Sequence, residues 1–302
     1  MSQTHEEWLE QRRKGLGGSD IAAMMGLSPW KSRFQLWQDK MGLIPHTEES
    51  EVMDWGKRME PTLRQFYADQ TGRLVRMATE ILYHPLHPIF FANPDGLTDC
   101  RRVVELKVAR HPNGWGEPGT AEVPDNYALQ VQHYMFVTGF DVADVVVTIG
   151  GGYPRIYTVP ADKEIHAVIQ EEGLKFWKQV EENIAPEPIS YTDAVAKFGM
   201  NNTVGVVFAS PDTVLVAEEL SAIRAQLAEL EAKEEDLKGK MIVAMGADGD
   251  ALVDAHGRSL ATYKLISGRK TLDTKAIEKN EPSVYAQYLK VGAPSRRFLL
   301  KI

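Results

Sequence analysis

Cysteine is nearly absent from this chain, which has 302 residues and a single cysteine, Cys100. One thiol excludes a disulfide framework, and it also excludes a zinc or iron–sulfur site built from four cysteines. The chain also lacks an apolar run long enough to span a membrane, and its first residues lack the pattern of a signal peptide. We therefore expect a cytoplasmic protein without a membrane partner.

Positive charge is also in short supply, because 34 Lys and Arg residues stand against 42 Asp and Glu residues, a net charge of −8. This balance excludes a protein that coats DNA by bulk charge, but it does not exclude an enzyme with a local basic groove. Hydrophobic residues make up 43% of the chain, enough for one sizeable core and a smaller unit. Candidate groove residues concentrate early in the chain: Arg12, Arg13, Lys14, Lys31, Arg33, Lys57, Arg58, Arg101, Arg102, Lys107 and Arg110.

The stretch 94–107, PDGLTDCRRVVELK, carries the clearest chemical signal. The apolar run 89–92 and the run 103–108 flank a polar turn, a pattern that predicts a β-hairpin. Side chains alternate along a strand, so Glu105 and Lys107 are expected on one face and Val104 and Leu106 on the apolar, core-facing one. Asp95 can reach the first face from the neighbouring strand.

Two carboxylates and a lysine at one place have a chemical use. Carboxylate oxygens suit Mg²⁺ or Mn²⁺, which polarise a phosphoryl oxygen and lower the pKa of bound water. A neighbouring lysine can hold the attacking water and offset negative charge. The alternative is an ordinary surface hairpin with a solvated Glu-x-Lys pair, and pattern alone leaves both open.

The glycine-rich segment 15–20, GLGGSD, is a second candidate. Ser19 is a candidate N-cap for a helix that runs to Met25 and ends at Gly26. Helix N-termini bind phosphate, and Arg12 upstream can add a guanidinium fork. The alternative is a plain loop with a helix cap.

Helical patterns cover most of the remaining first part of the chain. Ser32 and Gln35 form a capping box, and residues 52–70 form a longer helix with Glu60 at the edge of its apolar stripe. Glu60 is either a solvated boundary residue or a further acidic ligand. A helix is expected over 125–138, followed by a hairpin over 144–159 and a helix over 162–183. The stripe consists of Val52, Trp55, Met59, Leu63 and Phe66.

The C-terminal part follows a different pattern. Residues 189–212 look loop-like, and apolar residues then recur at alternating spacings of four and three between Val216 and Met241, interrupted only by Glu234. This heptad repeat predicts a coiled-coil-like helix that packs on its own domain or joins a partner. A small β-hairpin around 251–264 and a basic tail complete the chain. We therefore divide the chain into residues 1–190, a linker over 191–212 and an accessory region over 213–302.

Several of these signals occur in the order found in one family. The chain resembles the YqaJ-like phage recombinase nucleases, relatives of lambda exonuclease in the PD-(D/E)XK nuclease superfamily. The resemblance spans most of residues 5–185 and leaves the C-terminal hundred residues unassigned. The matching segments are Trp8, Arg12, 17–21, 55–57, Glu60, 94–96, 105–107, 130–134 and 137–139.

The resemblance implies a fold and a set of roles. The fold is α/β (α+β), a mixed central β-sheet flanked by helices, as in restriction endonucleases. Asp95 and Glu105 would ligate Mg²⁺, for which Mn²⁺ can substitute, and the backbone carbonyl of Leu106 would complete the protein ligands. Glu60 would support the metal, and Lys107 would orient the attacking water. Gln130 would position the water or the phosphate with Tyr127 or Tyr134 nearby, and Arg12 and Ser19 would grip a DNA 5′-phosphate.

The implied activity is Mg²⁺-dependent 5′-to-3′ digestion of linear double-stranded DNA, which leaves 3′ single-stranded tails for recombination. The implied partners are duplex ends, a single-strand annealing or single-strand-binding protein, and further copies of the chain in a homo-oligomer such as a trimer. Two alternatives stay open. The chain can be an endonuclease of the restriction or repair type, or a non-catalytic protein that binds DNA ends as a scaffold.

Overall fold

The computed structural model describes residues 10–44, 50–78, 80–199, 205–247, 249–290, 292 and 296–302. Trp8, one of the matching positions above, lies outside them. The chain divides into two compact units, Met1–Lys197 and Phe198–Ile302. Within the described ranges no helix is both long enough and apolar enough to cross a membrane.

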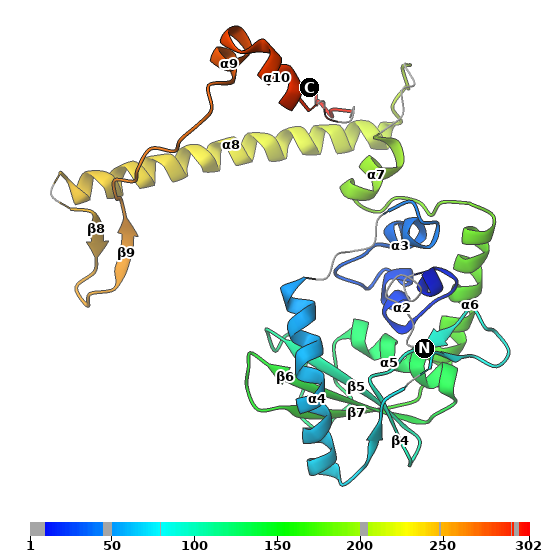
Figure 1. The fold of residues 1–302 in the computed structure, drawn as a ribbon. Coiled ribbons are helices and arrows are strands. Elements are labelled where there is room, and N and C mark those ends of the chain that lie inside the picture. Colours follow the sequence, from blue (N-terminus) through cyan, green and yellow to red (C-terminus); the bar gives the residue numbers. More distant parts are fainter. Residues whose placement is uncertain are drawn as a thin grey trace. The chain divides into compact units, whose positions relative to one another are not determined.

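A five-stranded mixed sheet organises the first unit, in the order β1-β4-β5-β6-β7 (Figure 1). Strands β5 and β6 are parallel, while the other neighbours are antiparallel. A two-stranded ladder, β2 with β3, lies apart from this sheet. The strands are β1 Val75–Arg76, β2 Leu82–Tyr83, β3 Phe91–Ala92, β4 Gly96–Thr98, β5 Arg102–Ala109, β6 Val142–Ile149 and β7 Arg155–Pro160.

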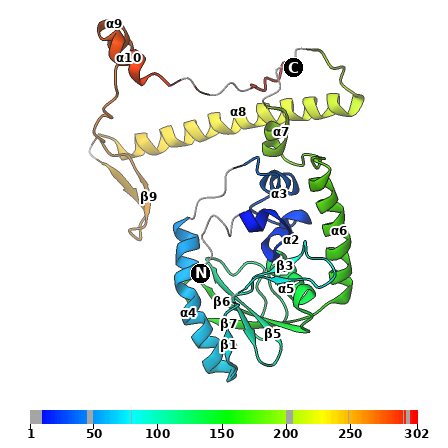
Figure 2. The ribbon, with the colours of Figure 1, turned by 45° about the vertical axis from the view of Figure 1, so that its right-hand side comes forward.

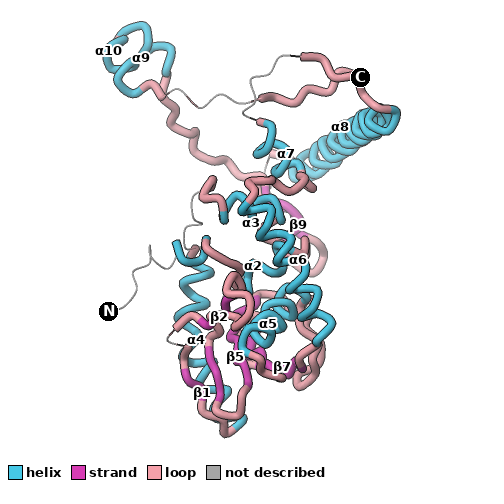
Figure 3. Tube along the Cα trace, turned by 90° about the vertical axis from the view of Figure 1, so that its right-hand side faces the viewer, coloured by secondary structure: helices cyan, strands magenta, loops and turns pink. Residues whose placement is uncertain are grey.

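Helices cover both faces of the sheet, as Figures 2 and 3 show. Helix α4 packs Leu63 and Tyr67 against Val104, Leu106 and Val146 on one face. Helices α2, α5 and α6 cover the other face, where the larger core lies. The helices of this unit are α2 Gly18–Met24, α3 Arg33–Lys40, α4 Glu51–Thr71, α5 Asp125–Thr138, α6 Lys163–Glu181 and α7 Tyr191–Phe198. The predicted mixed sheet flanked by helices is therefore confirmed.

Local signals placed several helix ends correctly. Ser32 accepts a hydrogen bond from the Gln35 N–H at 3.1 Å and the Gln35 side chain accepts one from the Ser32 N–H at 3.0 Å, the predicted capping box. Gly72 and Gly139 end α4 and α5 with φ of +68°, a backbone conformation that favours glycine.

Three expectations within this unit are wrong. The hairpin partner of β5 is β4, not the run 89–92, because Phe91–Ala92 pairs with β2 instead. The cap of α2 is Gly17, whose N–H donates to Asp20 Oδ2 at 3.0 Å, and Ser19 already lies inside the helix. Of the α4 stripe only Leu63 is buried, since Phe66 is half-buried and Val52 and Trp55 are 54% and 56% exposed.

The segment expected to be a loop-like linker contains helix α7. Its Asp193 is fully buried and accepts hydrogen bonds from the Ser32 hydroxyl at 2.7 Å and the Ile189 N–H at 3.4 Å. The buried residue of this short helix is therefore a polar one, held by hydrogen bonds. Residues 200–204 of the expected linker lie outside the described residues.

The second unit is described by itself. Its long helix α8, Pro211–Met245, contains the predicted heptads, and the predicted hairpin is present as β8 Ala251–Val253 and β9 Ser259–Thr262. Two short helices follow within the segment expected as a basic tail, α9 Thr274–Asn280 and α10 Pro282–Tyr288.

Candidate active site

The turn before β4 and the middle of β5 form one structural element. Asp95 Oδ2 accepts a hydrogen bond from the Leu106 N–H at 2.8 Å, and the Asp95 carbonyl accepts one from Arg64 on α4 at 3.2 Å. Asp95 is therefore held against the strand segment that carries Glu105 and Lys107. The structure brings these three predicted residues together.

Glu105 is buried, with only 2% of its surface exposed, because α5 covers its face of the sheet. Its Oε1 accepts hydrogen bonds from Lys107 Nζ at 2.6 Å and from Gln130 Nε2 at 2.7 Å. Its Oε2 is buried and has no hydrogen-bond partner among the described residues. Because burying an unpaired carboxylate oxygen is costly, this oxygen points to a site that takes a cation or a proton.

The charges around Glu105 shift its pKa strongly. Burial, together with the nearby Asp95 carboxylate, raises the pKa of Glu105 to about 8, against the opposing effect of Lys107. Burial alone would lower the pKa of Lys107, but Glu105 and Asp95 outweigh it and leave that pKa raised. Lys107 therefore stays protonated at neutral pH, while the pKa of Glu105 lies close to neutral pH.

Glu60 approaches the same group from α4. Burial and the Asp95 charge raise the pKa of Glu60, while Arg64, Lys57 and Lys107 oppose this shift. Its side chain is 35% exposed and lies 4.0 Å from Arg64. Glu60 thus stands at the solvent edge of the carboxylate pair rather than inside it.

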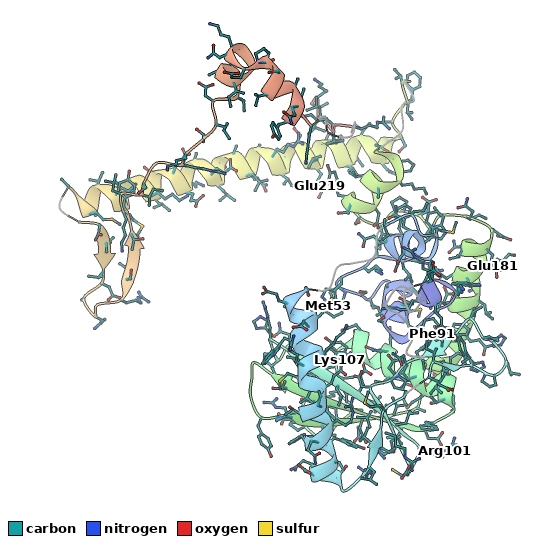
Figure 4. All side chains as sticks on the ribbon, viewed as in Figure 1. Met53, Phe91, Arg101, Lys107, Glu181 and Glu219 are labelled. Atoms are coloured by element: carbon teal, nitrogen blue, oxygen red, sulfur yellow. The ribbon has the colours of Figure 1, made fainter. Side chains whose placement is uncertain are left out.

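This donor set fits a hard divalent cation. Among the described residues, no three His, Cys, Asp or Glu side chains are close enough together to hold a metal ion. The fit rests instead on two neighbouring carboxylates, one with an unpartnered buried oxygen, and a backbone carbonyl would be the third protein ligand. Lys107, labelled in Figure 4, lies on β5 and donates to Glu105 Oε1 at 2.6 Å.

The glycine segment packs directly on the helix that supports Glu105. A Cβ built on Gly18 would lie 2.5 Å from the Tyr134 ring and 3.0 Å from Gln130, and a Cβ on Gly17 would lie 2.8 Å from Phe91. Only glycine allows this approach, so the start of α2 is set against α5 at Gln130.

Arg12 and Ser19 meet next to this contact. Arg12 Nη2 donates to Ser19 Oγ at 2.9 Å and lies 3.7 Å from Asp20 Oδ1. Ser19 is exposed and the Arg12 side chain is one-third exposed, at 33%. The predicted phosphate-binding pair is therefore together and open to solvent.

A buried ion pair between Lys40 and Asp20 holds Arg12 and Ser19 in place. Lys40 on α3 donates to Asp20 Oδ2 at 2.6 Å and to the Arg12 carbonyl at 2.7 Å. Burial would raise the pKa of Asp20, but Lys40 and Arg12 outweigh it and lower that pKa to about 2. Burial lowers the pKa of Lys40. Lys40 carries no signal in the sequence, because a lysine on a helix normally faces water unless it is paired.

The two predicted tyrosines differ. Tyr134 is 5% exposed, its hydroxyl accepts a hydrogen bond from Gln130 at 3.0 Å, and its ring packs beneath Gly18. Tyr127 is half-buried, and its ring centroid lies 5.0 Å from Lys107 Nζ. Trp115 and Trp30 flank Tyr127, with ring centroids 5.6 and 6.4 Å away.

Several expected groove residues are bound to acids instead. Arg102 forms a two-pronged contact with buried Asp144 at 2.6 and 2.8 Å, and Tyr67 donates to the same carboxylate at 2.6 Å. Arg33 contacts Glu172 at 3.4 Å and Arg58 contacts Asp54 at 2.7 Å. Arg102 and Arg33 are half-buried by these contacts and contribute to the fold, whereas the Arg58 side chain stays 69% exposed.

The chain is similar to a known protein family and to one curated relative. Residues 7–141 match the family model of the YqaJ-like viral recombinase domain. An uncharacterized protein of Bacillus subtilis (strain 168), YqaJ, is 29% identical over 312 residues, which is 99% of this chain and 94% of the relative.

Two solved structures are also similar. The alkaline exonuclease LHK-Exo of Laribacter hongkongensis is 25% identical, with a TM-score of 0.49, over 59% of this chain and 94% of its own. A phage-related exonuclease of Haemophilus somnus 129PT is 14% identical, with a TM-score of 0.44, over 56% of this chain and 95% of its own. The family match covers the glycine segment, the Asp95–Glu105–Lys107 group and Gln130, which confirms the resemblance seen in the sequence. Residues 7–141 of this chain are therefore similar to the YqaJ-like viral recombinase domain family.

Proposed function

We propose that this chain is a metal-dependent nuclease that digests linear double-stranded DNA from its ends. One observation carries the proposal: Asp95 and the buried, partly unpartnered Glu105 lie together beside a protonated Lys107. The family description as a recombinase domain agrees with a DNA substrate.

The proposed metal is Mg²⁺, with Mn²⁺ as a substitute. Asp95, Glu105 and the Leu106 carbonyl would hold it, and Glu60 would support it from α4. A divalent cation bound there supplies Lewis acidity at the phosphoryl oxygen and lowers the pKa of bound water.

The chain's own residues do the rest. Gln130 donates to Glu105 Oε1 and so fixes the carboxylate, leaving Oε2 for the metal. Lys107 carries a positive charge at the edge of the site, where it orients the attacking water and offsets the negative charge that develops on the phosphate. Tyr127, beneath the Lys107 ammonium, restricts its position.

The Arg12–Ser19 pair sets the proposed polarity. A 5′-terminal phosphate carries more negative charge than an internal one, and a guanidinium with a hydroxyl at a helix start suits it. Gly18, next to Ser19, packs on α5 at Gln130, and Gln130 donates to Glu105. A 5′-end bound at Arg12 and Ser19 would therefore leave the next phosphodiester near the carboxylates. The product would be a 3′ single-stranded tail, the substrate of an annealing or single-strand-binding protein.

The test is digestion of an end-labelled linear duplex, with either a 5′-phosphate or a 5′-hydroxyl, in Mg²⁺, in Mn²⁺ and in EDTA. We expect metal-dependent loss of nucleotides from the 5′-phosphorylated strand and an intact 3′-tailed partner strand. A covalently closed circle should be spared.

Other outcomes identify the alternatives. Efficient cutting of the circle would identify an endonuclease. Binding to the duplex without cleavage in either metal would identify a non-catalytic DNA-end-binding protein.

A further inference from the structure

Helix α8 exposes an apolar seam along its length. The helix is continuous over 35 residues, as Figures 1 and 2 show, and none of its side chains is buried. Most of the stability of a helix in a protein comes from packing its apolar face, and the apolar face of α8 is not packed among the described residues. The exposed seam residues are Val216 at 62%, Ile223 at 44%, Leu227 at 53%, Leu230 at 60% and Leu237 at 59%.

The seam has the spacing of a two-stranded coiled coil. Assigning the apolar residues to heptad positions a and d places Glu234 as the single charged residue at an a position. The repeat spans residues 216–244, about four heptads, enough to sustain a coiled coil. The a positions are Leu220, Leu227, Glu234 and Met241, and the d positions are Val216, Ile223, Leu230, Leu237 and Ala244.

We propose that α8 pairs with α8 of a second copy of this chain, antiparallel, with the two-fold axis between Ala228 and Glu229. In this register Leu227 of one copy lies opposite Leu230 of the other, and each a residue meets a d residue. Glu234 therefore meets Ile223, which keeps the two Glu234 carboxylates apart in different layers of the seam. The proposal concerns assembly and does not depend on the nuclease chemistry proposed above.

The flanking charges select this arrangement. In an antiparallel pair, e positions face e positions and g positions face g positions. Arg224 then faces Glu231 of the second copy, and Glu219, labelled in Figure 4, faces Lys240. The two-fold axis repeats both pairs, so the seam gains four opposite-charge contacts and no like-charge contact.

A parallel pair is disfavoured by the same residues. There each g position faces the next e position of the other helix, so Lys233 would face Lys238 on both sides. Glu234 would also face Glu234 across the core, which would bury two like charges. Only the Glu219–Arg224 contact would be favourable.

Sliding the antiparallel pair by one heptad gives fewer opposite-charge contacts. A shift in one direction places Arg224 opposite Arg224 and keeps only the two Glu219–Lys233 contacts favourable. A shift in the other direction places Glu231 opposite Glu231 and Arg224 opposite Lys238. The charges thus choose one register among those that keep the apolar seam in contact.

Ion pairs within one α8 helix compete only weakly with the proposed contacts between two helices. Lys240 lies 2.6 Å from Asp236 and Lys238 lies 2.6 Å from Glu234, but all four side chains are more than half exposed, so such pairs contribute little. Within the described part of the chain, Arg224 and Glu231 form no ion pair, and both are exposed. They are therefore available to each other across the proposed dimer.

Light scattering coupled to gel filtration of the full chain tests the assembly. One chain weighs 33.8 kDa, and we expect twice that mass across a dilution series until the dimer dissociates. A monomer at all concentrations, as expected if α8 packs on its own chain, would overturn the proposal. A stable trimer would overturn it equally.

Charge reversal tests the register. Arg224→Glu and Glu231→Arg should each weaken the dimer by about tenfold, because each turns two attractive contacts into repulsive ones. The double variant restores opposite charges and should dimerise like the wild type. Glu218→Arg on the outer face is the matched control for Glu231→Arg and should leave the dimer unchanged.

The double variant decides between the geometries. In a parallel pair, Arg224→Glu would place a second carboxylate opposite Glu219, a repulsion that Glu231→Arg cannot relieve. Failure of the double variant to recover would therefore refute the antiparallel register, as would an Arg224→Glu variant that dimerises normally.

Discussion

The backbone N–H of Leu106 donates to Asp95 Oδ2 at 2.8 Å, and this contact joins a turn carboxylate to the middle of a buried strand. It brings Asp95 close enough to Glu105 to raise the pKa of that carboxyl, although ten residues separate the two in the chain. Every expectation about catalysis depends on this juxtaposition.

Glu105→Gln and Lys107→Ala should each abolish cleavage while preserving DNA binding. The first removes a carboxylate of the proposed metal site, and the second removes the ammonium that offsets charge on the phosphate, so losses on the order of a thousandfold are expected. Cleavage rates and fluorescence-anisotropy titrations of a labelled duplex measure the two properties. Lys163→Ala, at an exposed ion pair on α6, is the control. Near-normal cleavage by either active-site variant would remove the assigned site.

Gln130→Leu should lower turnover without weakening DNA binding, because the lost amide no longer holds Glu105. Hydrogen-bond donors favour an ionised carboxylate, so losing one raises the Glu105 pKa further and shifts the pH–rate profile upward. A profile that keeps its position would show that Gln130 has no effect on Glu105. Gln130→Glu should be worse than Gln130→Leu, because it adds a like charge beside Oε1.

Arg12→Ala should reduce the preference for 5′-phosphorylated over 5′-hydroxyl ends. Arg12→Lys should retain part of it, because it keeps the charge but loses the two-pronged geometry. Initial rates on the two substrates give the ratio, and Arg76→Ala, on the exposed face of β1, controls for lost positive charge. An unchanged ratio in Arg12→Ala would separate this residue from the 5′-end.

Metal binding should release protons. Because the Glu105 pKa is about 8 without metal, this carboxyl is mostly protonated at pH 7 and must ionise to bind a cation. Apparent Mg²⁺ affinity should therefore rise with pH up to about 8 and then level off. Calorimetry in two buffers of different ionisation enthalpy counts the protons, and Glu105→Gln should abolish the difference. Equal heats in both buffers for the wild type would contradict the prediction.

The Asp20–Lys40 ion pair should make stability fall in acid. The Asp20 pKa is depressed from 3.8 to about 2, so its contribution is complete above pH 3.8 and disappears as the pH falls toward 2. This lowering of the Asp20 pKa corresponds to about 2 kcal/mol of unfolding free energy.

At neutral pH, Asp20→Asn should cost more, about 3 kcal/mol, because Lys40 stays buried without a counter-charge. Denaturation of both forms between pH 2 and pH 7 tests this. The difference in unfolding free energy between the wild type and Asp20→Asn should become smaller below pH 4. A difference that stays constant with pH would contradict the prediction.

Much of the local structure could be predicted from the sequence. The capping box at Ser32, the glycine ends at Gly72 and Gly139, and the alternation along 103–108 depend on hydrogen bonds and dihedral preferences within a few residues. The Asp95–Glu105–Lys107 group was predictable for the same reason, since the turn and strand that hold it are adjacent in the chain.

Only the tertiary structure decided how these residues are used. The burial of Glu105 depends on α5, the role of Asp20 depends on Lys40 twenty residues away, and Tyr134 became a core residue because Gly18 packs on it. The strand pairing of Phe91–Ala92 and the exposure of Trp55 likewise depend on which distant surfaces meet. Sequence patterns encode short-range geometry and the period of an apolar face, whereas the partner of that face is chosen by packing over the whole chain.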